Sequence, residues 1–534
     1  MLNARPERSE CYAEALCRQK GWVPERVFCN QYLITPDTQT AAGIEGWQVS
    51  KIGGWTLWHD PNLTVCEVID ASGTKVGLLC GVAVGPTNTV VESELKLSFP
   101  ADRADARTMF EDLLMDVRGR YVTLVRLAGH AYVYTDPGAD MGVVYDATAR
   151  RLGLSLPLVL DRSLTPGSDV TKLSLLRGTT PLRAGMTADS QVRRLLPNHF
   201  LCLDTFETQR FWPREAPTLA GSLEEQRAIG CDIAERLGQN ISAFVRYGSS
   251  AIPISGGKDS PILLSLAASR GTLPDISYTH RTNWISGYDA ILGEKIANHL
   301  KVPFRFLDAI SLCQDERWSK EAGQERTLRF VRSGFSSPKV SKTDAMSTLM
   351  VPDVRLVLRG NMMELLGGRF HQSDSVHNLE QTQRLIWGRN PKNNDETALW
   401  ESVYLSWKNG LPAEMPEKTG LDLAFIELLY SHAMAVVLQS LPKVFYLNPF
   451  SDRYLISQTM RIPSVNRRNQ SLYSTILERG SAIPKLQTPK RLGKQDSENH
   501  GRQLADFLGD KASDLEIYTT QAAPEHDVLT ARDV

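Results

Sequence analysis

The residues best suited to chemistry form one short segment between two apolar runs: Ser255, Gly256, Gly257, Lys258, Asp259 and Ser260. Residues 251–254 before it read as a buried strand, and a helix is predicted to begin at Pro261 after it. Paired glycines let a backbone curve closely around an anion, serine hydroxyls add donors, and a helix N-terminus presents N–H groups. The segment therefore favours a bound pyrophosphate group. An acidic Asp259 beside phosphates suggests an accompanying Mg²⁺ ion.

A tight glycine turn without a ligand is the competing interpretation of this segment. The Walker pattern GxxxxGK[ST] does not occur in the sequence, which disfavours a P-loop that transfers phosphoryl groups. The segment instead resembles the phosphate loop of the PP-loop ATP pyrophosphatases, which activate an oxygen as an adenylate and release pyrophosphate. The resemblance implies that residues 255–260 bind ATP and that Asp259 binds Mg²⁺.

The surrounding sequence predicts the elements that must position this turn. Between residues 223 and 307, helical patterns alternate with short apolar runs, an order typical of right-handed crossovers and a parallel sheet. The first 212 residues read mainly as β, with strands at 64–70, 75–85, 120–134 and 142–148, and predict antiparallel sheets.

The domain boundary is expected near residue 218. An aperiodic Pro/Gly/Ala stretch ends there, and Ser222 and Glu225 follow with the spacing of a helix capping box. We therefore expect domains over 1–218 and 219–510, followed by a C-terminal tail at 511–534.

Four further stretches resemble asparagine synthetases in their order and spacing: residues 119–145, 195–212, 447–463 and 471–493. The third carries Pro449, Phe450 and Asp452, similar to that family's "PFLD" segment. The resemblance implies an α/β plus α+β chain in which an Ntn-type, glutaminase-like β-rich sandwich precedes a PP-loop adenylation domain with a parallel sheet and a helical C-terminal half. It also implies that Lys490 is a catalytic lysine that reaches over the α-phosphate.

Two departures from the family bear on activity. Glutamine-dependent members carry a nucleophilic cysteine at position 2, where this sequence has Leu2, and Cys11 lacks the glycine that follows that nucleophile. The N-terminal domain therefore resembles those of β-lactam synthetases and lasso-peptide cyclases, which attack an adenylated carboxylate with an amine instead of ammonia.

The second departure lies at residues 359–368, which correspond to the family's metal-binding stretch SGxGADELFGG. Met363 stands where the family has a metal-binding aspartate. Three interpretations remain open: Glu364 takes over that role as a catalytic residue, Arg359 supplies a fixed positive charge, or Glu364 lies on a solvated helix. A tyrosine typical of β-lactam synthetases is also absent, which weakens that specific assignment.

Together these features predict an ATP- and Mg²⁺-dependent, AMP-forming ligase that joins a small-molecule or peptide carboxylate to an amine, as in natural-product or antibiotic biosynthesis. A catalytically degenerate scaffold or partner protein is the alternative, followed by a PP-loop enzyme that modifies RNA. The formal net charge of −1 and the absence of a basic, aromatic-interleaved stretch make nucleic acid an unexpected partner. A homodimer or a biosynthetic partner protein remains open.

Composition and cysteine spacing narrow the class further. The 42% apolar and 23% charged residues are those of an ordinary folded protein. Eight cysteines without a CxxC pair argue against a zinc or iron–sulfur site, and the polar opening segment predicts a cytoplasmic protein with reduced thiols. The apolar run Leu423 to Leu438 is predicted to be a buried helix and not a membrane span. The polar segment 387–400 is predicted to be a surface loop, and His280 either a ligand-contacting or a hydrogen-bonded strand-end residue.

Overall fold

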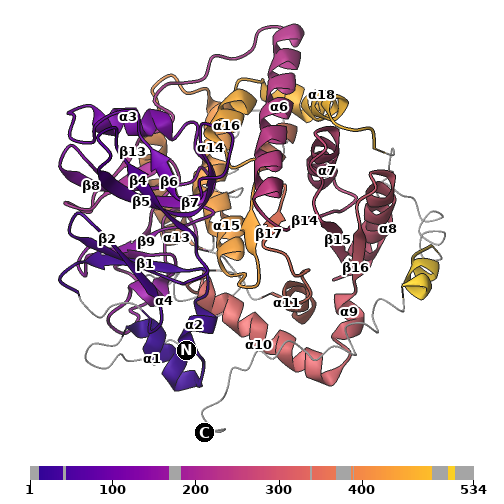
Figure 1. The fold of residues 1–534 in the computed structure, drawn as a ribbon, viewed down its shortest axis with the longest axis horizontal. Coiled ribbons are helices and arrows are strands. Elements are labelled where there is room, and N and C mark those ends of the chain that lie inside the picture. Colours follow the sequence, from indigo (N-terminus) through magenta and orange to yellow (C-terminus); the bar gives the residue numbers. More distant parts are fainter. Residues whose placement is uncertain are drawn as a thin grey trace.

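The computed structural model describes residues 11–39, 44–167, 182–336, 340–368, 386–388, 390–391, 393–483 and 503–511. It is a mixed α/β fold with three sheets and a helical C-terminal half (Figure 1). Two sheets are built from residues before 211, and one parallel sheet is built from residues after 249. The predicted change from antiparallel to parallel strands is therefore present.

The N-terminal sheets pack face to face. The six-stranded sheet has the order β11 (Val192–Arg194), β9 (Val144–Asp146), β10 (Arg151–Gly153), β1 (Tyr32–Pro36), β3 (Trp55–His59), β2 (Gln48–Ile52). The seven-stranded sheet has the order β13 (Thr208–Arg210), β12 (His199–Cys202), β8 (His130–Thr135), β7 (Arg118–Leu127), β5 (Lys75–Val84), β4 (Val65–Ile69), β6 (Glu94–Lys96). Ile34 and Leu57 of the first sheet share a core with Leu78 and Leu124 of the second. Strand pairs are antiparallel in both sheets, except that β4 pairs with β6 in parallel.

Three short helices cover the outer faces of these sheets. Helices α1 (Tyr12–Lys20) and α4 (Leu156–Val159) pack on the six-stranded sheet, and α3 (Ala106–Leu113) packs on the other through Phe110 and Tyr134, whose ring centroids are 5.4 Å apart. Helix α2 (Pro24–Val27) follows α1. The strands predicted at 64–70, 75–85, 120–134 and 142–148 are confirmed by β4, β5, β7 with β8, and β9.

The parallel sheet has the order β16 (Phe304–Leu307), β15 (Ile276–His280), β14 (Ser250–Pro253), β17 (Leu356–Leu358), β18 (Phe445–Leu447). In chain order this is 3-2-1-4-5, so the direction of winding changes between β14 and β17. Ile252 and Leu358 face the core beneath helices α7 (Asp259–Ser269) and α8 (Trp284–His299), whereas Ala251 and Val357 face α10 (Glu316–Arg332) and α11 (Lys342–Leu349). Both faces are covered, as in doubly wound α/β proteins.

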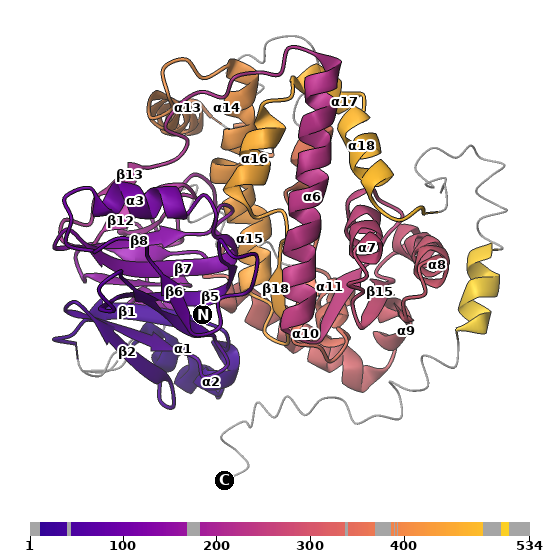
Figure 2. The ribbon, with the colours of Figure 1, turned by 45° about the horizontal axis from the view of Figure 1, so that its top comes forward.

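Helix α6 (Leu223–Tyr247) runs between the antiparallel sheets and the parallel-sheet region (Figures 1 and 2). Ser222 caps it by accepting from the Glu225 N–H at 3.1 Å, which confirms the N-cap, but the Glu225 carboxylate accepts from Gly221 instead of completing the box at Ser222. The helix packs against α7, α16 (Arg453–Met460) and α18 (Ser471–Arg479). A short helix, α17 (Ser464–Arg468), joins the last two.

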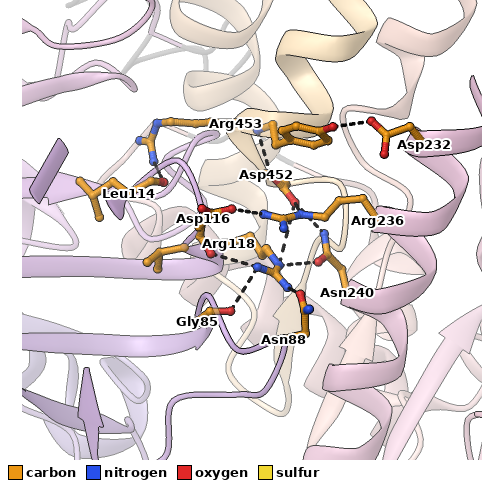
Figure 3. A network of polar contacts seen from close by, with 12 residues as sticks. Gly85, Asn88, Leu114, Asp116, Arg118, Asp232, Arg236, Asn240, Asp452 and Arg453 are labelled. Carbon is orange, nitrogen blue, oxygen red and sulfur yellow. Dashed lines mark hydrogen bonds and ion pairs between the residues drawn. The ribbon is translucent and has the colours of Figure 1, made fainter. Parts of the chain in front are cut away.

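A buried polar network joins α6 to the seven-stranded sheet and to α16 (Figure 3). The Asp452 carboxylate accepts from Arg236 Nε at 2.8 Å and Asn240 Nδ2 at 3.0 Å, and lies 4.0 Å from Arg118 Nε. Arg118 also donates to Asn240 Oδ1 at 2.6 Å. Asp452 therefore connects α6 and β7 to α16, which it also caps through the Tyr454 N–H.

A continuous helical run follows α13 (Asn394–Asn409): α14 (Glu417–Ala424), a π-helical segment (Phe425–Tyr430) and α15 (Ser431–Gln439). Among the described residues it is the one run whose length and composition would allow a membrane span, and 78% of its most apolar window is buried in the fold. The buried helix predicted at Leu423 to Leu438 is thus confirmed. Glu427 accepts from Arg210 Nη2 at 2.6 Å, and Tyr430 donates to Asp140 at 2.7 Å, so the run also contacts the N-terminal sheets.

The surface loop predicted at 387–400 is wrong in its second half. Helix α13 begins at Asn394, capped by Asn393 through the Glu396 N–H at 2.9 Å. Trp387 and Trp400 are buried and stack with centroids 4.7 Å apart. The polar residues between the two tryptophans suggested an exposed loop, although the tryptophans at its ends form a buried pair.

Candidate active site

A cavity of about 350 Å³ opens at the carboxyl ends of β14, β15 and β17. Its lining comes from the strand ends, the predicted phosphate turn, the segment after β17, and helices α8 and α15. These residues are Pro253, Ile254, Ser255, Gly257, Lys258, Asp259, Ser260, Tyr278, Thr279, His280, Ser286, Asp289, Arg359, Gly360, Asn361, Glu364 and Met434. This is the point where the winding of the sheet reverses, the usual ligand position in open α/β sheets.

The turn is shaped by hydrogen bonds among its own residues. Ser255 N–H donates to Ser260 Oγ at 3.0 Å, and Gly257 N–H donates to Ser255 Oγ at 3.2 Å. Helix α7 begins at Asp259 and not at the predicted Pro261, because Ser260 already belongs to its first turn. The N-terminus of this eleven-residue helix, with its partial positive charge, therefore forms part of the cavity wall.

Close packing around the turn leaves no room for a side chain at Gly256 and at Gly360. A Cβ atom on Gly256 would lie 2.6 Å from Leu292 Cδ1 and 2.9 Å from Asp289 Oδ1, and one on Gly360 would lie 2.8 Å from Asp259 Cβ. Gly257 is exposed toward the cavity, and a Cβ atom added to it would have only one neighbour within 4 Å, Ser255 Oγ at 3.2 Å. The N–H groups of Ser255, Gly256 and Gly257 donate to side chains of the protein in this structure. Because Gly257 has no side chain, a phosphate group could still approach the turn closely.

Asp259 is held by a tyrosine that the sequence did not indicate. Tyr473 O–H lies 2.7 Å from Asp259 Oδ1 and 2.9 Å from the carbonyl oxygen of Met363. Lys258 Nζ lies 5.5 Å from the centroid of the same ring. Tyr473 belongs to α18, more than two hundred positions from Asp259 in the chain.

The segment after β17 resolves part of the question raised by Met363. The Met363 side chain is fully buried in the core, whereas Glu364 and Arg359 line the cavity. Glu364 lies in a short 3₁₀ helix, Met363–Gly367, and is half-buried, so the interpretation of a solvated helix face is wrong. Asp259 and Glu364 thus border the same space.

His280 ends β15 and faces the cavity between Tyr278 and Arg359. Burial and the nearby Arg359 guanidinium together lower the pKa of its imidazole to about 3, although a hydrogen bond with the Ser347 backbone opposes the shift. Its Nε2 atom is buried without a hydrogen-bond partner among the described residues. The ring is therefore neutral at pH 7. The hydrogen bond with Ser347 supports the interpretation of a hydrogen-bonded strand-end residue, and contact with a ligand stays a prediction.

The carboxylates at the cavity fit a Mg²⁺ ion that would also be bound by phosphate oxygens. The described residues contain no group of three or more His, Cys, Asp or Glu side chains arranged for a metal. Mg²⁺ in nucleotide sites is usually bound by one or two carboxylates, phosphate oxygens and water, so Asp259 and Glu364 are sufficient in number.

Asp289 is a further residue that sequence reasoning missed. Its Oδ1 accepts from the Gly256 N–H at 3.0 Å, so a carboxylate from α8 contacts the turn that is expected to bind an anion. Its place in the helical pattern after His280 gave no such signal. Of the residues near it, Tyr288 packs in a core with Phe507, and Asn283 caps α8.

Three positions considered in the sequence analysis do not contribute to this cavity as the structure describes it. Lys490 and Leu2 lie outside the described residues. Cys11 is the buried N-cap of α1, and burial raises the pKa of its thiol to about 12. A thiol with that pKa is not a nucleophile at neutral pH.

A larger cavity of about 500 Å³ lies elsewhere, between α2, α10 and the Pro442–Lys443 segment. Its deepest charges are satisfied inside the protein: Arg332 Nη1 donates to Glu325 at 2.9 Å, and Lys443 Nζ donates to the Val351 carbonyl at 2.6 Å. The arrangement contains no glycine turn, so the smaller cavity is the better candidate.

Comparison of the chain with protein-family models found no matching model, and comparison with curated proteins found no matching sequence.

Proposed function

We propose that this chain is an ATP-dependent, AMP-forming synthetase that joins a carboxylate to an amine. A carboxylate oxygen attacks the α-phosphorus of ATP and pyrophosphate leaves. The amine nitrogen then attacks the acyl carbon of the adenylate, AMP leaves with the carboxylate oxygen, and the amine loses a proton. The product is an amide, a lactam or an isopeptide.

One observation carries this proposal: the Ser255–Ser260 turn and an α-helix N-terminus border a cavity at the winding reversal of the parallel sheet. Polar N–H groups at this position bind the phosphates of nucleotides in many α/β proteins. The pattern SGGKDS, with no Walker lysine–serine pair, favours loss of pyrophosphate over phosphoryl transfer.

The lining residues divide into three roles. The turn would bind the leaving pyrophosphate, and Asp259 with Glu364 would hold Mg²⁺, which neutralises phosphate charge when bound. Arg359 would add a fixed positive charge on the β17 side of the cavity. Lys490 keeps the role that the resemblance to asparagine synthetases implies, opposite the α-phosphate.

The N-terminal sheets fit the same proposal as a degenerate glutaminase-like sandwich. The buried Cys11 and the Leu at position 2 support an amine as the nucleophile instead of ammonia from glutamine. The substrate would be a small-molecule or peptide acid with an amine partner in natural-product biosynthesis, and the enzyme would act in the cytoplasm.

Product analysis tests the reaction class. The full chain is incubated with Mg·ATP, a panel of carboxylic acids and hydroxylamine, a small amine that traps acyl-adenylates as hydroxamates. We expect AMP, pyrophosphate and a hydroxamate with at least one acid. ADP and inorganic phosphate as products would contradict the proposal.

A binding experiment tests the site itself. Gly257→Ala places a methyl group on the cavity surface, so ATP affinity measured by calorimetry should fall at least tenfold with an unchanged melting temperature. Gly221→Ala is the matched control, because no atom lies within 4 Å of its added Cβ. Equal affinities of the two variants would contradict a nucleotide site at this turn.

A catalytically degenerate scaffold is the second candidate function. It is favoured by Met363, which replaces the metal-binding aspartate and turns away from the cavity. ATP binding without pyrophosphate release, across the whole acid panel, would support that alternative.

A further inference from the structure

Tyr473 joins the two sides of the candidate site. Its hydroxyl lies between Asp259 Oδ1 on the α7 side and the Met363 carbonyl oxygen on the β17 side, at 2.7 and 2.9 Å. Because a phenol has one proton and both neighbours are acceptors, the charged carboxylate is the stronger competitor for it. The hydroxyl thus restrains the Asp259 carboxylate and holds it at a fixed distance from the segment after β17.

The tyrosine ring is itself held firmly. A Cβ atom added to Gly367 would lie 2.9 Å from Tyr473 Cε2, and the side chain is 7% exposed. Lys258 lies over the ring, and α18 packs on both α6 and α7. The orientation of the hydroxyl is therefore fixed by packing and does not depend on a ligand.

We propose that Tyr473 is a positioning residue that orients the Asp259 carboxylate for the divalent cation that accompanies the nucleotide. This inference rests on the proposed function. Carboxylates that bind metals are commonly held by a second hydrogen bond, and removing that bond typically weakens metal affinity about 10- to 100-fold. Tyr473 is expected to act through Asp259 and not on the nucleotide directly.

Mn²⁺ affinity measured by electron paramagnetic resonance tests this role on the full chain. The titration is made with α,β-methylene ATP, a non-cleavable analogue, at a concentration that saturates the wild type. Tyr473→Phe removes the hydroxyl and keeps the ring, so Mn²⁺ affinity should fall about 10- to 100-fold. Affinity for the analogue in EDTA and the melting temperature should not change.

Tyr454→Phe is the matched control, because Tyr454 also donates to a carboxylate, that of Asp232, but on the surface beside α6. It should leave Mn²⁺ affinity unchanged. Gly367→Ala is a second variant that displaces the Tyr473 ring while keeping its hydroxyl, and it should weaken Mn²⁺ binding as well. Combining Tyr473→Phe with Asp259→Asn should add nothing to the loss caused by Asp259→Asn alone.

The outcomes separate the two proposals. Wild-type protein that binds no analogue overturns the nucleotide site and this inference together. Wild-type binding with unchanged Mn²⁺ affinity in Tyr473→Phe overturns the inference and leaves the site in place. Equal losses of analogue affinity with and without metal would also overturn it, since Tyr473 would then shape the turn and not orient a metal ligand.

Discussion

The network at α6 and the cavity beside β14 are both rich in polar side chains, but the two regions use them differently. At α6 the partners of Asp452 and Arg118 come from the protein itself, and the groups are fully buried (Figure 3). At the cavity, the turn, Arg359 and Glu364 surround a space of about 350 Å³. Charge enclosed by protein partners stabilises the fold, whereas charge arranged around a space can bind a ligand.

Part of the resemblance to asparagine synthetases lies in the network at α6 and not at the cavity. Asp452 belongs to the stretch that matches "PFLD", yet it contacts Arg236 and Asn240 and does not line the cavity. A similarity in that stretch therefore reports how the two halves of the chain are joined. It carries less information about the reaction than the SGGKDS turn does.

The largest expected effect comes from breaking the network at α6. Asp452→Asn leaves the Arg118 and Arg236 guanidinium groups close together without their carboxylate, and should lower the free energy of unfolding by about 3–5 kcal/mol in urea denaturation. Asp105→Asn, which breaks an exposed pair with Arg103, should leave stability nearly unchanged. Similar, small effects of both substitutions would show that the network is not needed for stability.

Loss of catalysis without loss of stability is expected for Lys490, the lysine that the resemblance to asparagine synthetases places over the α-phosphate. Lys490→Ala should reduce turnover at least a hundredfold, because a fixed charge near the developing transition state contributes about 3–4 kcal/mol. ATP affinity and melting temperature should stay unchanged, as should the turnover of Lys485→Ala and Lys494→Ala. Equal, small effects of all three would indicate surface lysines and favour the scaffold alternative.

A pH experiment extends the comparison to a charge buried between the sheets and α15. Burial and the charge of neighbouring Asp136 together raise the pKa of Asp140 to about 7. The folded state therefore holds a proton that the unfolded chain releases near pH 4, and this contribution to stability is lost as the pH rises from about 4 to about 7.

Asp140→Asn removes that titration. Relative to the wild type, the variant should be more stable at pH 8 than at pH 5 in urea denaturation. The amide can still accept the Tyr430 hydrogen bond, so the difference isolates the charge. A difference independent of pH would refute the raised pKa.

The smallest expected effect is a gain in affinity. Asp289→Asn keeps an acceptor for the Gly256 N–H but removes a negative charge from the phosphate turn, so pyrophosphate affinity should rise roughly three- to tenfold at low salt. Asp275→Asn is the control, since Asp275 accepts the Ser250 N–H at the opposite end of β14. A loss of affinity that appears only with Mg²⁺ would instead identify Asp289 as a metal ligand.

Much of the fold could be predicted because local patterns determine it. The strand–turn–helix unit at 250–269 and the alternation up to Phe304 follow from apolar runs and glycine turns, and both are present. The N-cap at Ser222 was read from two residues. Such features depend on neighbours within a few positions of the chain.

The rest of the site depends on residues that meet only in three dimensions. Asp259 gave a local signal, but Tyr473 on α18 and Asp289 on α8 carry none of their own. The orientation of Met363 into the core and Glu364 into the cavity is set by the 3₁₀ turn after β17, and the replacement of the family's aspartate by Met363 does not reveal it.

The π-helical segment Phe425–Tyr430 gives this helical run a place where its length can change. A π turn contains about one residue more than an α turn, so it accommodates an extra residue without rotating the helix that follows. Loss of one residue inside the segment would restore a plain α-helix and keep His432 and Gln439 directed at Gly185 and Ala139, their partners in the N-terminal half. Loss of one residue between His432 and Gln439 would instead turn Gln439 by about 100° relative to His432. Related chains that dock the same two halves through this run should therefore differ in its length only at the π-helical segment.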